Sequence, residues 1–263
     1  CSSVPLQPWH SEELTEEFTE DKAEEVTSFA DYLELEDRLF RELDEMVYAQ
    51  TESGPKFRLD RYSAGSAVDP RDRKPDWNRS FEFAADNPKG AVLLLHGMSD
   101  SPYALRTLGR AMNRENFWVL GMRLPGHGTA PSGLRHIRHE DMTAAVRIGM
   151  RHLGEKMQGK PVHIMGYSNG ATLALEFALD ALEGKVGPVP GSLVLVSPSI
   201  GIHPSAGLAS FKDWLGSLPG LSGLALGTRP DCLDAEKLDL LARAARALPL
   251  FWLELGLQSA QDA

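Results

Sequence analysis

The sequence predicts an α/β protein with a doubly wound, mostly parallel sheet, and three observations lead to this fold class. From about Ser80 onward, strand-like and helix-like segments alternate, as they do where helices connect parallel strands. The strand-like segments from Ala91 onward are nearly continuous apolar runs, which is typical of parallel strands covered on both faces. A Gly-x-Ser-x-Gly motif also stands directly between one such strand and a helix.

The elements of this core can be placed one by one. The expected strands are Ser80–Ala85, Ala91–Leu95, Trp118–Met122, Val162–Met165 and Leu193–Val196. The expected helices are Pro102–Asn113, Glu140–Met157 and Ala171–Leu182, the last of which contains neither proline nor glycine. A chain of 263 residues is long enough to bury one sizeable core.

The formal net charge of -10 belongs to one segment near the N-terminus. Between Ser11 and Gln50 there are 15 acidic and 3 basic residues, which leaves 22 acidic and 24 basic residues elsewhere. Apolar residues recur at helical spacing in this segment, so it predicts an amphipathic arm of two helices packed on the main domain, with Thr27 or Ser28 as the cap of the second. The segment from Ser53 to Pro75 reads as connecting loop with one strand at Lys56–Tyr62. A partner-binding role for the arm is the alternative.

The segment Gly166-Tyr167-Ser168-Asn169-Gly170 follows the apolar run Val162–Met165 and precedes a helix. In this context the serine occupies the apex of a tight, strained turn and its hydroxyl is exposed above the sheet. A Cβ at either glycine would collide with the neighbouring strand or helix. Ser168 is therefore the candidate catalytic nucleophile.

Two further motifs follow earlier strands: His96-Gly97-Met98-Ser99-Asp100-Ser101-Pro102 and Leu124-Pro125-Gly126-His127-Gly128. With the serine motif, in this order, they resemble the α/β-hydrolase superfamily, in particular its branch of monoacylglycerol lipases, carboxylesterases and serine aminopeptidase-like enzymes. The resemblance covers about Phe81 to Ser199. It implies that the backbone N–H groups of Met98 and Asn169 form an oxyanion hole and that His127 is structural. His96 is expected to shape its loop rather than act as the general base.

The resemblance also implies a triad in the chain order Ser, Asp or Glu, His, with the acid and base on loops after later strands. After Ser168 the sequence contains one histidine, His203, which would require an unusual order as the base. The residues beyond Ser199 read as a partial helical lid, with a helix near Asp234–Leu248 and no further strand. The acid and base are therefore expected beyond Ala263.

Composition excludes several other classes. Outside the acidic segment there is no basic patch for nucleic acid, and no apolar run is long enough to cross a bilayer. The two cysteines, Cys1 and Cys232, lack metal-type spacing, so no metal or other cofactor is expected. The start Cys1-Ser2-Ser3-Val4-Pro5 resembles a processed bacterial lipoprotein, which implies lipidation at Cys1 and anchoring on the periplasmic side of an envelope membrane.

The sequence thus predicts a lipoprotein-type linker (1–10), an acidic arm with a connecting loop (11–79), an α/β-hydrolase core (80–200) and a lid region (201–263). The expected function is hydrolysis of carboxylic esters, of acylglycerol or short acyl type (EC 3.1.1.-), with a small-molecule ester as the partner. Two alternatives stay open. One is a non-catalytic envelope protein with a hydrolase fold, and the other is a serine aminopeptidase-like enzyme that binds the substrate amine through Asp213 or Glu236.

Overall fold

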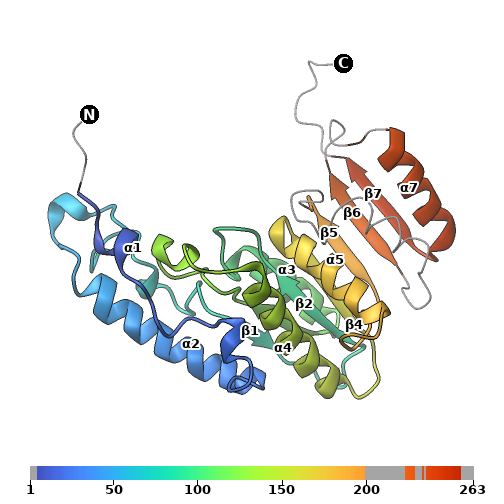
Figure 1. Ribbon diagram of the computed structural model, residues 1–263, viewed down its shortest axis with the longest axis horizontal. Coiled ribbons are helices and arrows are strands. Elements are labelled where there is room, and N and C mark those ends of the chain that lie inside the picture. The colour runs from blue at the N-terminus through green and yellow to red at the C-terminus, as the bar shows by residue number, and fades with distance from the viewer. Residues whose placement is uncertain (1–4, 199–222, 229–232, 234, 256–263) are drawn as a thin grey trace.

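The structure is a computed structural model that describes residues 5–198, 223–228, 233 and 235–255. A seven-stranded sheet runs through it in the order β1-β3-β2-β4-β5-β6-β7 (Figure 1). Strand β1 pairs antiparallel with β3, and the other pairings are parallel. The strands are β1 (Phe81–Phe83), β2 (Ala91–Leu95), β3 (Trp118–Met122), β4 (Val162–Tyr167), β5 (Leu193–Val196), β6 (Leu224–Thr228) and β7 (Phe251–Leu255).

Helices cover both faces of this sheet, which confirms the doubly wound prediction. The longer helices are α2 (Phe29–Leu43), α3 (Tyr103–Arg114), α4 (His139–Met157), α5 (Asn169–Leu182) and α7 (Ala235–Ala247). Alternate residues of β2 divide between two cores. Leu93 and Leu95 are buried with residues of α4, α5 and α7, whereas Val92 and Leu94 are buried on the opposite face, where side chains of α3 pack. The apolar side chains on both faces explain why the central strands read as continuous apolar runs.

The prediction that no strand follows Ser199 is wrong, because β6 and β7 extend the sheet beyond β5. Strand β6 is missed because its segment is rich in glycine and leucine and has little intrinsic strand preference. Tertiary packing forms it: Leu224 and Leu226 are buried in the same core as Leu240 and Leu241 of α7. The helix expected near Asp234–Leu248 is confirmed as α7.

The acidic arm packs on the core through α2, as expected, but its first half is not a helix. Ser28 caps α2: its hydroxyl accepts from Asp31 N and its own N–H donates to the Asp31 carboxylate. Before it, the structure has α1 (Pro8–Ser11) and the 3-10 turn η1 (Glu20–Lys22). Here side chains satisfy backbone groups, since the Glu42 carboxylate accepts from Thr15 N and Glu16 N at 2.8 Å. Because a side chain accepts these hydrogen bonds, the backbone N–H groups of Thr15 and Glu16 are satisfied without a helix.

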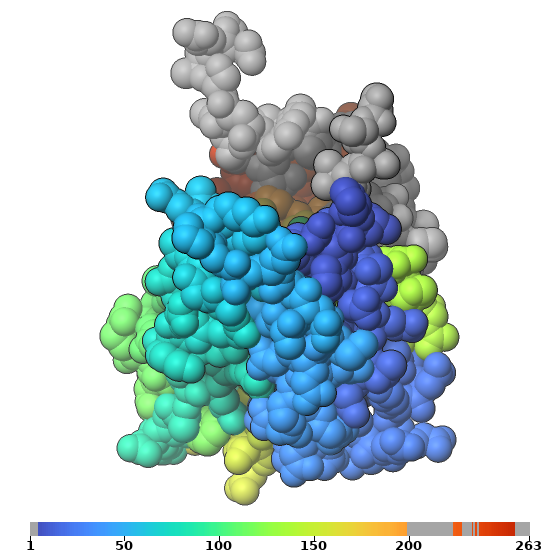
Figure 2. All heavy atoms as spheres, turned by 90° about the vertical axis from the view of Figure 1, so that its left-hand side faces the viewer, coloured from blue at the N-terminus to red at the C-terminus, as the bar shows by residue number. Residues whose placement is uncertain are grey.

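Turns make up the end of the arm and the connecting loop that follows it. The 3-10 turn η3 (Pro55–Phe57) occupies the segment expected as a strand, so that prediction is wrong. A π turn, η2 (Asp44–Tyr48), and the 3-10 turn η4 (Pro70–Asp72) complete this part. Figure 2 shows the arm, in blue to cyan, covering one end of the molecule. Among the described residues, no helix has the length and apolar character needed to pass through a lipid bilayer.

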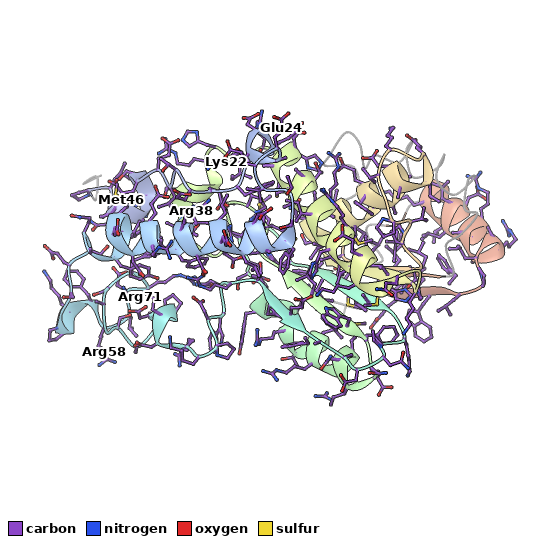
Figure 3. All side chains as sticks on the ribbon, turned by 90° about the horizontal axis from the view of Figure 1, so that it is seen from below. Lys22, Glu24, Arg38, Met46, Arg58 and Arg71 are labelled. Carbon is purple, nitrogen blue, oxygen red and sulfur yellow. The ribbon has the colours of Figure 1, made fainter. Side chains whose placement is uncertain are left out.

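Charged side chains hold the arm together along α2 (Figure 3). Lys22 Nζ donates to the carbonyl oxygens of Thr15 and Glu17, and Arg38 pairs with Glu16 at 2.9 Å. These contacts are exposed or partly exposed, so each contributes little to stability by itself. They nevertheless fold the segment before α2 back along this helix, which brings Glu17 to the core.

Candidate active site

Ser168 stands where β4 ends and α5 begins, in a backbone conformation that side chains rarely adopt. Its φ is 52° and its ψ is -114°, and its N–H donates to Val196 O at 2.8 Å. A non-glycine residue with positive φ costs energy and persists only where the surrounding structure imposes it. The side chain is partly exposed at the carboxyl edge of the sheet. This is the strained strand–helix junction that the motif predicts.

The two glycines of the motif are required by close contacts. A Cβ on Gly166 would lie 2.3 Å from Gly170 O, and a Cβ on Gly170 would lie 2.2 Å from Leu95 O. Neither distance can be relieved by moving a flexible side chain, because both neighbours are backbone atoms. The glycines therefore let the turn close against α5 on one side and against β2 on the other, as predicted.

The loop after β2 meets this turn at Gly97. A Cβ on Gly97 would lie 2.9 Å from Tyr167 Cδ1 and 3.4 Å from Ser168 Cβ, so its backbone packs directly on the turn. Met98 and Asn169, the two residues predicted to donate to an oxyanion, thus follow segments that meet beside Ser168. Asn169 opens α5 and belongs to the first turn of helix N–H groups, which lack a helical acceptor. In the described part of the chain, neither backbone N–H donates a hydrogen bond.

His96 is fully buried and its two ring nitrogens are both engaged. Nε2 accepts from Leu124 N at 3.1 Å, so the proton sits on Nδ1, which donates to Gly97 O at 2.9 Å. Burial, reinforced by the neighbouring His127, lowers the pKa of His96 to about 3. A neutral imidazole with no free lone pair cannot take the proton of Ser168. His96 instead fixes the Gly97–Met98 peptide group, whose other end is the Met98 N–H.

We predict that His96→Phe lowers kcat for ester hydrolysis about tenfold to a hundredfold with KM within about twofold. This loss is smaller than the factor of about 10²–10³ expected when an oxyanion donor is removed. The reason is that the variant keeps the Met98 N–H and only lets the Gly97–Met98 peptide group change its orientation. Steady-state kinetics of both proteins with one soluble ester measures the split. Equal changes in kcat and KM, or no change, would contradict a positioning role.

The same substitution has a second readout in stability. Because folding depresses the pKa of His96 below its ordinary value of 6.5, the unfolded chain binds the proton first as the pH falls. The free energy of unfolding of the wild type should therefore decrease as the pH drops from about 6.5 toward 3. Denaturant titrations at several pH values should show a shallower decrease for His96→Phe.

Residues of the acidic arm hold the loop after β3 in place. Arg123 is fully buried, and its Nη1 and Nη2 donate to the two oxygens of the Glu17 carboxylate at 2.9 Å each. Glu17 Oε2 also accepts from Gly126 N at 2.9 Å, and Tyr32 of α2 donates its hydroxyl to Arg123 O at 2.8 Å. His127 is buried with Nδ1 paired to Pro125 O, which agrees with the structural role expected for it. This ion pair between Arg123 and Glu17 was not predicted from the sequence, because Glu17 lies in a run of acidic residues that normally face solvent.

Other predicted residues lie outside the described part of the chain. Cys1, His203 and Asp213 belong to this group, as does the side chain of Glu236. Among the described residues, no histidine or carboxylate hydrogen-bonds Ser168 Oγ. Within the described ranges, the loop that leads to Met98 therefore packs on the turn of Ser168 and Asn169, and no acid or base reaches the Ser168 hydroxyl.

The sheet order, the strained serine and the adjoining loops define the α/β-hydrolase class. The chain belongs to the family described as Serine aminopeptidase, S33 (Hydrolase_4), which matches residues 86–237. A structure of the metagenome-derived lipolytic enzymes LipS and LipT shares the fold, with a TM-score of 0.51 and 16% identity over 69% of this chain and 88% of that one.

Two curated relatives carry the names of enzymes that hydrolyse esters. The chain is 31% identical to a thermostable monoacylglycerol lipase of Bacillus sp. (strain H-257) over 137 residues, 51% of this chain and 54% of that protein. It is 30% identical to a carboxylesterase of Bacillus subtilis (strain 168) over 109 residues, 41% of each chain. The chain thus spans about half the length, or less, of these two relatives.

Proposed function

We propose that the protein hydrolyses carboxylic esters, of acylglycerol or short acyl type, with Ser168 as the nucleophile. The observation that carries the proposal is the strained serine at the β4–α5 junction, with two backbone N–H groups on adjoining segments that donate to no described residue. Ser168 Oγ gives its proton to the general base and attacks the ester carbonyl, and the N–H groups of Met98 and Asn169 stabilise the negative charge on the carbonyl oxygen. The ester C–O bond then breaks, the alcohol leaves with that proton, and an acyl-enzyme remains. Water then releases the acid. The names of the two Bacillus relatives support this reaction class.

The proposed reaction also needs a general base that activates Ser168 and an acid that orients this base. In the printed sequence, the histidine after Ser168 is His203, and Asp231 and Asp262 follow β6 and β7 by three and seven residues. With His203 as the base, either acid would follow the base in the chain, which reverses the acid-then-histidine order of this class. All three residues lie outside the described ranges.

The test is covalent labelling. A fluorophosphonate probe should modify the protein at Ser168, which peptide mass spectrometry would locate. Labelling at another residue would place the nucleophile elsewhere, and no labelling would favour the non-catalytic alternative. The family name favours a peptidase as the second candidate. Comparing hydrolysis of a p-nitrophenyl ester with that of an aminoacyl p-nitroanilide separates the two activities.

Lipid attachment at Cys1, and with it a place on the periplasmic side of an envelope membrane, stays a proposal supported by the sequence Cys1–Pro5. Mass spectrometry of the N-terminal peptide of the protein from its native membrane would test it. An unmodified thiol at Cys1 in that peptide would contradict the proposal.

A further inference from the structure

A chain of hydrogen bonds leads from the acidic arm toward the candidate oxyanion hole, and its first half joins α2 to His96. The Tyr32 hydroxyl donates to Arg123 O at 2.8 Å. The N–H of the same peptide group is that of Leu124, and it donates to His96 Nε2 at 3.1 Å. A peptide group is planar and rigid, so the tyrosine and the histidine are bound to the two ends of one stiff unit.

The second half of the chain runs from His96 to Met98. His96 Nδ1 donates to Gly97 O at 2.9 Å, and the N–H of that peptide group belongs to Met98, a candidate oxyanion donor. Both peptide groups and the imidazole accept a hydrogen bond at one end and donate one at the other. Hydrogen bonds arranged head to tail in this way polarise and strengthen one another. The Tyr32 hydroxyl is the first donor of this series, and the Met98 N–H is its last.

The chain lies in the interior, where the Tyr32 hydroxyl is held in place and keeps its proton. Tyr32 and His96 are both 0% exposed. Burial raises the pKa of the Tyr32 hydroxyl, so it remains a donor. The Tyr32 ring packs on Phe18 and Phe29 of the arm, with centroids 5.3 and 6.5 Å apart. The arm therefore fixes the position from which this hydroxyl donates.

A second tyrosine shows the same kind of bond outside the chain. Tyr62 is also buried, and its hydroxyl donates to Thr129 O at 3.2 Å, on the same loop after β3. Both ring nitrogens of His96 are already engaged, so the Thr129 peptide group does not join this series. The two tyrosines thus satisfy buried carbonyl groups alike, and they differ in what lies at the other end of the peptide group.

We infer that Tyr32 is a positioning residue for ester hydrolysis, since its hydroxyl orients and polarises the groups that end in the Met98 N–H. The inference rests on the proposed function and adds a residue of the arm to it. Tyr32 precedes residue 86, where the family match begins. A segment outside the matched region therefore helps to set the oxyanion hole of this chain.

The first experiment removes each tyrosine hydroxyl and keeps the ring. Tyr32→Phe should lower kcat for p-nitrophenyl butyrate about threefold to tenfold, the range for a residue that acts through a network. KM should stay within about twofold, because the negative charge on the carbonyl oxygen develops only in the transition state. Tyr62→Phe is the matched control. It also leaves a buried carbonyl without its tyrosine donor, so thermal unfolding should change to a similar extent, whereas kcat should stay within about twofold.

The second experiment tests whether Tyr32 acts through His96. In a His96→Phe background the chain is already interrupted, so adding Tyr32→Phe should change kcat by less than about twofold, whereas independent effects would multiply. Proton NMR gives a readout without turnover. The His96 Nδ1–H resonance, identified by its loss in His96→Phe, should move upfield in Tyr32→Phe and stay in place in Tyr62→Phe, because its hydrogen bond weakens only in the former.

Three kinetic results would overturn the inference: an unchanged kcat in Tyr32→Phe, equal losses in the two tyrosine variants, or the full Tyr32→Phe loss in the His96→Phe background. If the wild type hydrolyses no ester, the proposed function fails. The NMR result then decides by itself whether the Tyr32 hydroxyl acts on His96, and an unmoved resonance would overturn that link as well.

Discussion

Ser168→Ala should reduce ester hydrolysis by about 10⁶ in kcat, the loss found when a catalytic serine that acts together with its base is removed. The hydroxyl belongs to a residue with positive φ, in the turn on which the backbone of Gly97 packs. Alanine also carries a Cβ, so the backbone strain at this position is unchanged and the fold should be retained. Initial rates with p-nitrophenyl butyrate and a thermal unfolding curve measure both properties.

Ser197 provides a matched control for this substitution. It follows β5, has a φ of 46° and is exposed, so it resembles Ser168 in its place at a strand end. It lacks the flanking glycines and the helix that follows directly. Ser197→Ala should leave the rate within about twofold. A Ser168→Ala protein with more than a tenth of the wild-type rate would show that the nucleophile is elsewhere.

The central sheet was predictable because its signals are local. Strands β2 and β3 were placed to the residue, since each is a short apolar run whose side chains pack on both faces. The turn around Ser168 was predictable for the same reason: two glycines and a serine at fixed spacing describe the backbone contacts by themselves. Local patterns of this kind predict structure without knowledge of what lies across the fold.

Features that depend on distant partners were not predictable. Strand β6 forms because β5 and β7 flank it and α7 covers it, and its glycine- and leucine-rich sequence carries no strand pattern. Glu17 lies in a run of acidic residues, where a charged side chain normally faces solvent, yet it is buried against Arg123.

Glu17→Ala should destabilise the protein by about 3–5 kcal/mol, because it leaves the buried Arg123 guanidinium without its main partner. The remaining acid nearby, Glu36, lies 4.0 Å from Arg123 Nε, and burial raises the pKa of the Glu36 carboxyl. The Gly126 N–H also loses its acceptor. Denaturant unfolding, compared with Glu16→Ala, measures the effect. Glu16 is a partly exposed neighbour whose ion pair with Arg38 should be worth less than about 1 kcal/mol.

The double variant Glu17→Met/Arg123→Met separates two roles of the ion pair. Replacing both charges of a buried pair with apolar side chains is often neutral or stabilising, so the double variant should recover most of the stability lost by Glu17→Ala. It does not restore the bond from Gly126 N to the carboxylate, nor the bond from Arg123 Nη1 to His127 O, and both hold the loop after β3 in place. If the arm positions this loop for catalysis, the double variant should be stable yet hydrolyse p-nitrophenyl butyrate more slowly than the wild type. Full recovery of that rate would show that the ion pair contributes stability alone.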